Sequence, residues 1–266
     1  MFKNFRENQQ NSSERSLLEA KICDKYKFAM SKNKITNTDF LNMTELKIVE
    51  KFLKENKINE YIIFGGCDAE TDRNIIIFYN SKFTKEMVEK NYSKILQVIR
   101  IENPKELNYE HRNYLSAIMK LGIKREKIGD IFVREDGADI VVLTEVASFL
   151  KDNLQTLTRF KRSKCDIINI KDIKYKEKEF EEIKIIVSSM RLDNFVSELA
   201  KTSRNKALEI INEQKVFVDY ELETKFSKKI NLGNTINIRG KGKFIVEEIH
   251  HKTKNNKFVV VIKKYV

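Results

Sequence analysis

The feature that most constrains the fold is a run of short elements in the last third of the chain, with basic residues at each junction. One predicted helix has apolar residues at the spacing i, i+3, i+4, i+7: Leu192, Phe195, Val196 and Leu199. A second is predicted after a cap at Thr202 or Ser203, with its apolar face at Ala207, Ile210 and Ile211. Strands are predicted at Val216–Tyr220 and Thr235–Arg239, then a hairpin of Phe244–Ile249 and Lys257–Tyr265 across His250–Asn256. The pattern predicts a small α+β domain over residues 183–266.

Basic residues are concentrated in this same segment. Residues 183–266 contain 17 Lys and Arg against 9 Asp and Glu, whereas residues 1–90 contain 16 against 14 and residues 91–182 contain 18 against 16. A concentrated positive surface releases counterions when it binds a polyphosphate, so a nucleic acid is the predicted partner. An anionic membrane is the alternative. It is disfavoured because the charges lie among strand-like runs and not on one long basic amphipathic helix.

Length and composition set the remaining bounds. The chain has 266 residues, 41% of them apolar and 34% charged, which predicts two or three folded domains. The first residues show no apolar signal-peptide core, and no later run approaches the roughly 18 apolar residues that span a membrane, so we expect a cytoplasmic protein. Cys23, Cys67 and Cys165 lack the paired spacing of a zinc site and are expected to be reduced. We expect neither a metal nor a cofactor.

The first 90 residues predict an N-terminal α/β domain. Apolar residues at helical spacing run from Leu17 to Met30, a second helix is predicted at Thr44–Asn56, and strands at Glu60–Phe64 and Asn74–Tyr79. Gly65-Gly66 between the strands predicts a turn, because no Gly-Lys-Ser/Thr follows and the next element is a strand.

Residues 91–175 predict a central domain with the element order βαββαβ. The expected elements are Ser93–Glu102, Tyr109–Leu121, Asp130–Arg134, Ala138–Leu143, Thr144–Leu154 capped by Thr144, and Arg159–Ile168, with a charged linker at Lys171–Glu182. This is the ferredoxin-like arrangement that RNA-recognition modules share. Those modules stack bases on aromatic residues of their central strands, and the corresponding strands here have none. We therefore do not expect this sheet to read bases.

Candidate RNA-binding residues lie at the junctions. Arg204 and Lys206 fall in the first turn of a predicted helix, where the helix dipole already favours an anion. The glycines of Gly240-Lys241-Gly242 leave Arg239 and Lys243 room to approach a phosphate backbone. The basic loop after Gly122 has two equally good interpretations: its cations bind phosphate, or they only make the surface soluble. The full set is Arg191, Lys201, Ser203, Arg204, Asn205, Lys206, Lys215, Arg239, Lys241, Lys243, Lys124, Arg125 and Lys127.

Residues 190–244 resemble a known small RNA-binding domain, the αL motif first described in the fourth protein of the small ribosomal subunit. The resemblance rests on Arg191-Leu192-Asp193, on Ser203-Arg204, and on Ile238-Arg239-Gly240-Lys241-Gly242-Lys243-Phe244. Two positions depart from the pattern: Gln214 replaces a glycine, and Asp219-Tyr220 replaces Asn-Gly. A different bend is therefore expected where the strand begins.

Most of the chain resembles the YlmH family of bacterial RNA-binding proteins. The residues that carry this resemblance are Phe64-Gly65-Gly66 with Arg73, the run 110–115 (Glu-His-Arg-Asn-Tyr-Leu) and the run 121–131 (Leu-Gly-Ile-Lys-Arg-Glu-Lys-Ile-Gly-Asp-Ile). The resemblance implies three domains and a role on the large ribosomal subunit, in quality control of stalled peptidyl-tRNA, with an older link to cell division. Ribosomal RNA and tRNA are then the expected partners. We expect a monomer without a small-molecule substrate or membrane contact.

Enzymatic alternatives are disfavoured. Arg191-Leu192-Asp193 also resembles the catalytic triplet of pseudouridine synthases, but too few residues follow for a synthase domain. Lys27–Lys32 faintly resembles a nucleotide-binding loop of tyrosyl-tRNA synthetases, without its His-Ile-Gly-His companion. His111 has no Ser, Cys or acidic residue at an informative spacing, so it is not expected to be a general base. We therefore expect no catalytic residue.

Overall fold

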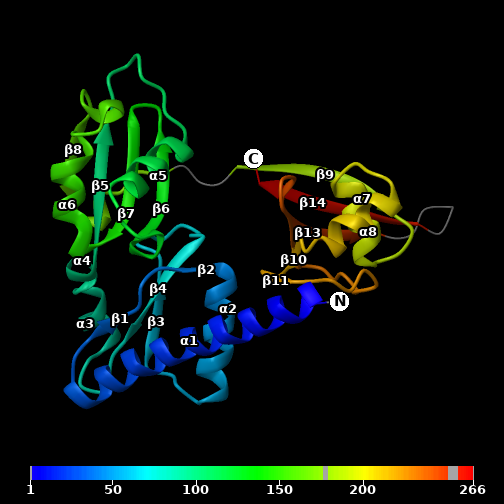
Figure 1. Ribbon diagram of the computed structural model, residues 1–266, viewed down its shortest axis with the longest axis horizontal. Coiled ribbons are helices and arrows are strands. Elements are labelled where there is room, and N and C mark those ends of the chain that lie inside the picture. The colour runs from blue at the N-terminus through cyan, green and yellow to red at the C-terminus, as the bar shows by residue number, and fades with distance from the viewer. Residues whose placement is uncertain (1, 176–178, 251–256, 266) are drawn as a thin grey trace. The chain divides into compact units, whose positions relative to one another are not determined.

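The computed structural model describes residues 2–175, 179–250 and 257–265, with side chains from residue 13 onward. The chain forms two compact units, residues 1–176 and 177–266 (Figure 1). Both units mix helices with antiparallel sheets, as the expected α+β class requires.

The first sheet of unit 1 is centred on β4 (Arg73–Phe78), which pairs with β3 (Tyr61–Phe64) along one edge. Two short strands, β1 (Thr36–Asn37) and β2 (Leu41–Asn42), share its other edge. Helices α1 (Phe2–Lys32) and α2 (Met43–Glu55) flank them in sequence. A capping box fixes the start of α2, because the side chains and backbone amides of Asn42 and Glu45 bond reciprocally.

Strand β4 is buried on both faces, which explains its unbroken run of apolar residues. Ile76 and Phe78 pack in a cluster with α1 and α2. Ile75 and Ile77 face the other way and pack with residues of the central sheet, such as Val98. The domains expected over residues 1–90 and 91–175 thus share a hydrophobic core within one unit. The short helices α3 (Lys85–Glu89) and α4 (Tyr92–Ile95) connect them.

The central part has the element order that the sequence predicts. Its elements are β5 (Leu96–Glu102), α5 (His111–Lys120), β6 (Ile128–Arg134), β7 (Gly137–Leu143), α6 (Thr144–Leu154) and β8 (Lys164–Ile168). The strands are antiparallel in the order β6-β7-β5-β8, so β7 lies between β5 and β6, the two strands that α5 connects. Helices α5 and α6 pack against one face of this sheet, with Tyr114 and Leu150 in the shared cluster.

Three boundaries in this region differ from prediction. Residues 93–95 belong to helix α4 and not to the strand. Residues 159–163 are not strand either, because a short helix at Thr158–Phe160 turns Phe160 into the core, where its ring stacks on Tyr114 at 5.5 Å. Thr144 is the first residue of α6 and not its cap; its hydroxyl is buried without a hydrogen-bond partner in the described part of the chain.

Unit 2 contains the two predicted helices, α7 (Leu192–Leu199) and α8 (Arg204–Asn212), packed on a six-stranded sheet. The strands are β9 (Phe180–Val187), β10 (Val216–Val218), β11 (Glu221–Leu222), β12 (Thr235–Ile238), β13 (Gly242–His250) and β14 (Phe258–Tyr265), in the order β11-β10-β12-β13-β14-β9. Strand β9 was missed and part of it was assigned to the linker. Its charges are exposed, while Ile185 and Val187 reach the core. The turn predicted at residues 250–256 lies largely outside the described residues.

Gln214 and the pair Asp219-Tyr220, where the sequence departs from the αL pattern, lie just before and just after β10. Gln214, Asp219 and Tyr220 have φ of 57°, 49° and 67°, the left-handed conformation that glycine favours. Asp219 holds this turn, because its carboxylate accepts hydrogen bonds from the Asn234 amide at 2.6 Å and the Thr235 backbone N–H at 2.8 Å.

Candidate nucleic-acid interface

A buried carboxylate organises two arginines at the start of α7 and α8. Asp193 is 1% exposed at its side chain. It accepts hydrogen bonds from Arg191 at 3.0 and 3.2 Å and from Arg204 at 3.0 and 2.7 Å. The arginine side chains remain 39% and 56% exposed. One carboxylate therefore fixes two guanidinium groups from different helices while each keeps donors available to solvent. We call Arg191, Asp193 and Arg204 the arginine clamp.

The electrostatics of the clamp favour the charged states of Asp193 and Arg191. Burial alone raises the pKa of Asp193, but the hydrogen bonds from Arg191 and Arg204 outweigh it and leave the pKa below its ordinary value. The hydrogen bond to Asp193 in turn raises the pKa of Arg191. The ring of Phe226 lies under Arg191, with the guanidinium carbon 5.8 Å from its centroid.

The other candidate residues at the helix pair lie on exposed surface. Of the two candidate caps, Ser203 caps α8, accepting a hydrogen bond from the Lys206 backbone N–H at 3.3 Å. Lys201 and Asn205 are exposed, and Lys201 has a φ of 51° in the turn between the helices. Lys206 is exposed but paired with Glu209 at 2.5 Å. Exposed pairs of this kind contribute little stability, so Lys206 can exchange Glu209 for a phosphate at small cost.

Cations of the strand region lie over aromatic rings. The Arg239 guanidinium is 4.9 Å from the Phe217 ring centroid. The Lys243 ammonium lies 5.0 Å from the ring of Tyr220 and 4.2 Å from that of Tyr265. Lys241 is exposed in the turn before β13, and Lys215 pairs with Glu213 at 2.7 Å. Sequence reasoning identified Arg239 and Lys243 but not the rings that contact them, because these rings lie about 20 residues away in sequence, in β10, β14 and the turn after β10.

The basic loop of unit 1 divides into one exposed and two internally bonded residues. Lys124 is exposed. Arg125 turns inward and donates to the backbone carbonyls of Ile128 at 2.6 Å and Gly129 at 3.2 Å. Lys127 forms ion pairs with Asp39 at 2.6 Å and Glu145 at 2.7 Å. The loop therefore joins the N-terminal and central parts, a use that its charges alone do not reveal.

Arg73, a residue of the YlmH-like pattern, meets the same loop. It donates to the carbonyls of Ile128 at 2.9 Å and Phe40 at 3.0 Å. Burial, followed by the nearby charge of Arg73, lowers the pKa of Arg125 to about 10. Two arginines from separate motifs thus converge on one strand end. Gly66 of the same YlmH-like pattern has a φ of 101°, and a Cβ there would lie 2.6 Å from the Val141 side chain.

The sheet face that RNA-recognition modules use for stacking is occupied in unit 1. At one end Leu96 and Val98 are fully buried against the N-terminal part. Further along, Asp139 is completely buried and accepts hydrogen bonds from Arg100 and Arg134. Arg100 and Asp139 each lie within an otherwise mostly apolar strand, β5 and β7, and this position is the sequence signal for a buried pair.

Phe132 on β6 lies on the same face and was not singled out from the sequence. Its ring packs on Tyr175, 5.7 Å between centroids, so the segment that follows β8 covers it. The face therefore does contain aromatic residues, but Phe132 and Tyr175 pack on each other beside the buried cluster of unit 1.

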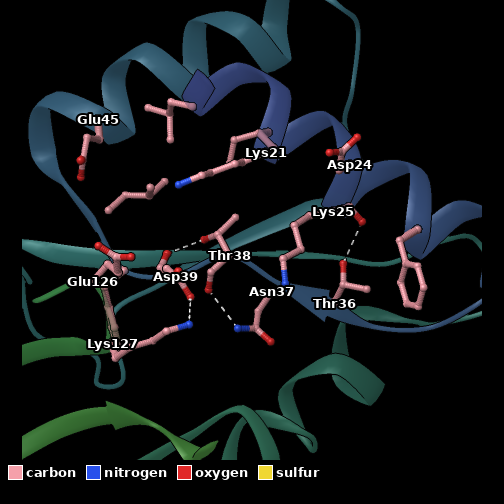
Figure 2. A pocket seen from close by; sticks show the side chains of 15 residues that line it. Lys21, Asp24, Lys25, Thr36, Asn37, Thr38, Asp39, Glu45, Glu126 and Lys127 are labelled. Atoms are coloured by element: carbon pink, nitrogen blue, oxygen red, sulfur yellow. Dashed lines mark hydrogen bonds and ion pairs between the residues drawn. The ribbon is translucent and has the colours of Figure 1, made fainter. Parts of the chain in front are cut away.

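A cavity of about 780 Å³ lies between α1, the β1–β2 segment and residues 126 and 127 (Figure 2). Lys21 extends into it, while Lys127 and Asp39 form an ion pair at its floor. Charges of both signs line it. Residues 27–32, compared above with a nucleotide-binding loop, are part of helix α1.

The remaining features concern possible metal ligands, the cysteines, His111 and the apolarity of the helices. Within the described ranges, His, Cys, Asp and Glu side chains form no group able to hold a metal ion. The three cysteines are free thiols, and burial raises the pKa of Cys165 to about 11. Burial also lowers the pKa of His111, which lies on the first turn of α5. None of the helices in the described part of the chain combines the length and apolarity needed to cross a membrane.

Comparisons with known proteins agree with the resemblance read from the sequence. Residues 88–177 match the model of the family described as "Putative RNA-binding domain in YlmH". A curated relative, "Ribosome-associated protein quality control protein P2" of Bacillus subtilis, is 26% identical over 228 residues, which cover 85% of this chain and 86% of the relative. A solved structure, "Cell division protein ylmH from Streptococcus pneumoniae", is 17% identical with a TM-score of 0.45 and covers 63% of this chain and 95% of its own. The resemblance to YlmH is confirmed.

Proposed function

We propose, starting from the YlmH-type domain of residues 88–177, that this protein is an RNA-binding factor that associates with the ribosome in the cytoplasm. The name of the Bacillus subtilis relative supports a role in ribosome-associated quality control. In its finer form the proposal is that the protein binds ribosomal RNA and tRNA on the large subunit, where a stalled peptidyl-tRNA remains. We assign the binding to three parts of the chain: residues 1–90 and 91–175, which share a hydrophobic core within unit 1, and an αL-motif domain at 183–266.

The arginine clamp is the observation that carries the proposal. Arg191 and Arg204 are held at a fixed separation by a buried carboxylate, so two cations are ordered before RNA arrives and little side-chain entropy is lost on binding. Lys206, Lys201 and Asn205 extend the same surface, and Arg239, Lys241 and Lys243 supply charge at the strand edge. Fixed cations recognise phosphate positions, which suits structured RNA.

The clamp also argues against an enzymatic role for Asp193. Both carboxylate oxygens accept hydrogen bonds from arginines, and the side chain is 1% exposed. A carboxylate in this position cannot approach a base as a nucleophile without first breaking the clamp. We therefore propose a non-enzymatic binding factor in which Asp193 positions the arginines.

Sedimentation with ribosomal particles tests the proposal. The purified protein is expected to pellet with isolated large subunits more than with assembled ribosomes, because a factor that contacts a stalled peptidyl-tRNA needs the interface that the small subunit covers. The double variant R204A/K206A should lose most of this binding, and K51A/K54A on α2 serves as a control with the same loss of charge. Preferential pelleting with small subunits would contradict the large-subunit assignment. Pseudouridine formation that Asp193→Ala abolishes would contradict the non-enzymatic one.

A further inference from the structure

The occupied sheet face leaves open how residues 88–177 contact RNA. Helices α5 and α6 cover the opposite face, and the exposed side of α5 lies next to a basic segment at residues 159–162. We infer that this helical side is a second RNA-binding surface, specific to the phosphate backbone. The inference rests on the proposed function and adds a site to it. We call the surface formed by Arg112, Ser116, Lys120, Arg159, Lys161 and Arg162 the helical-side surface.

Helix α5 contributes one row of this surface. Arg112, Ser116 and Lys120 recur every fourth residue, so they lie along one side of the helix, and all three are exposed. Tyr114 and Ile118 point to the opposite side and are buried against the sheet. The packing of the helix thus directs its cations to solvent.

The segment 159–162, which begins within the short helix Thr158–Phe160, contributes the second row. Buried and hydrogen-bonded residues hold it in place. Phe160 is fully buried between two exposed cations, Arg159 and Lys161. The Arg159 guanidinium donates to the Asn113 carbonyl and to the Ser116 hydroxyl of α5, both at 3.2 Å. It also lies 5.8 Å from the ring centroid of Tyr109. The two rows are therefore joined by direct bonds and form one continuous surface.

The charge balance of this surface favours an anionic partner. It has five cations, and the two carboxylates paired with them are Glu110, at 2.9 Å from Arg112, and Glu106, at 3.4 Å from Arg162. All four side chains are at least 67% exposed, so each arginine can exchange its carboxylate for a phosphate at small cost. Within the described residues, Lys120 and Lys161 have no carboxylate partner.

The surface suits an RNA backbone better than a membrane. A membrane-binding helix needs a broad apolar face beside its cations, whereas the exposed apolar residue on this part of α5 is Met119. Of the rings nearest the cations, Phe160 is fully buried and Tyr109 is partly buried against it. We therefore expect contact mainly with phosphates, which position an RNA without reading its sequence.

Charge reversal in the full-length chain tests the inference. With bulk tRNA as the probe, K161E/R162E is expected to bind at least about tenfold more weakly than the wild type. The slope of log affinity against log salt should fall by about 1 to 2, because two phosphate contacts are removed. The control K51E/K54E makes the same change in net charge on exposed positions of α2 and should leave the slope unchanged.

Two further results decide the outcome. The milder K120A/K161A removes the unpaired lysines and should weaken binding severalfold with an unchanged melting temperature, so the inference does not depend on one variant folding. Wild-type affinity in both helical-side variants, or equal weakening in K51E/K54E, would overturn the inference. If R204A/K206A still lost binding in that case, the proposed function would stand without the second surface.

Discussion

Four inward-facing arginines of unit 1 and the two arginines of the clamp in unit 2 are used in opposite ways. In unit 1, Arg73 and Arg125 donate to backbone carbonyls, and Arg100 and Arg134 bind a buried carboxylate. In unit 2, Arg191 and Arg204 also bind a buried carboxylate, yet both side chains stay more than a third exposed. Arg100 and Arg134 are 16% and 12% exposed. The same pairing therefore stabilises the interior of one unit and prepares the surface of the other, and only the exposed fraction distinguishes them.

Separating the units gives the strongest test of this comparison. Each unit has its own hydrophobic core, so a chain ending at residue 176 and a chain beginning at 177 are both expected to fold. The first should lose most affinity for ribosomal particles, and the second should bind RNA with a steep salt dependence, because unit 2 has most of the unbalanced positive charge. Filter binding across a salt series measures both. Full affinity in the 1–176 chain would break the comparison.

In unit 2, substitution of a core residue should lower the free energy of unfolding, whereas substitution of a surface cation should not. Phe195 is fully buried in the cluster beneath α7, so Phe195→Ala is expected to lower the free energy of unfolding by about 3–5 kcal/mol. Lys206→Ala should change it little and weaken RNA binding instead, because the side chain is exposed. Urea denaturation and RNA titration of both variants separate the effects. Equal destabilisation would show that the two faces of the helix pair are wrongly assigned.

Replacing one arginine of each unit by alanine tests whether it acts in stability or in RNA binding. Arg125→Ala leaves the carbonyls of Ile128 and Gly129 without this donor, and is expected to destabilise unit 1 by about 1–3 kcal/mol with little change in RNA affinity. Arg204→Ala should mainly weaken RNA binding, because Asp193 keeps its second partner, Arg191. Thermal melting and tRNA binding of the two variants provide the test. A larger loss of RNA affinity for Arg125→Ala than for Arg204→Ala would indicate that Arg125 itself contacts RNA.

The clamp predicts a smaller, pH-dependent effect. Because the folded-state pKa of Asp193 is below the ordinary value of 3.8, its ion pairs stabilise unit 2 fully above that pH and are lost as the pH falls through the folded-state pKa. Asp193→Asn is expected to cost about 1–3 kcal/mol at neutral pH. The difference from wild type should shrink below about pH 4. Urea unfolding of residues 177–266 across a pH series measures it, and a pH-independent difference would contradict the charged clamp.

Much of the fold could be predicted because local patterns determine it. The α7–α8 pair, the Ser203 cap and the order βαββαβ follow from apolar periodicity, capping residues and turns that act within a few positions. Strand β9 was missed because its partner β14 lies at the other end of the chain, and its charged residues hide the two apolar ones. Residues 159–163 were misassigned because the burial of Phe160 depends on Tyr114, which is distant in sequence.

By itself the sequence determined where charge accumulates and which residues are available to bind RNA. It could not determine which of them face solvent. Arg125 and Lys124 are neighbours in one basic loop, yet one bonds inside unit 1 and the other is exposed. Only the tertiary structure decided this, because a long cationic side chain takes the partner that packing brings within about 3 Å, whether a carbonyl, a carboxylate or water. The same packing buried one face of the central sheet and left its helices open to a partner.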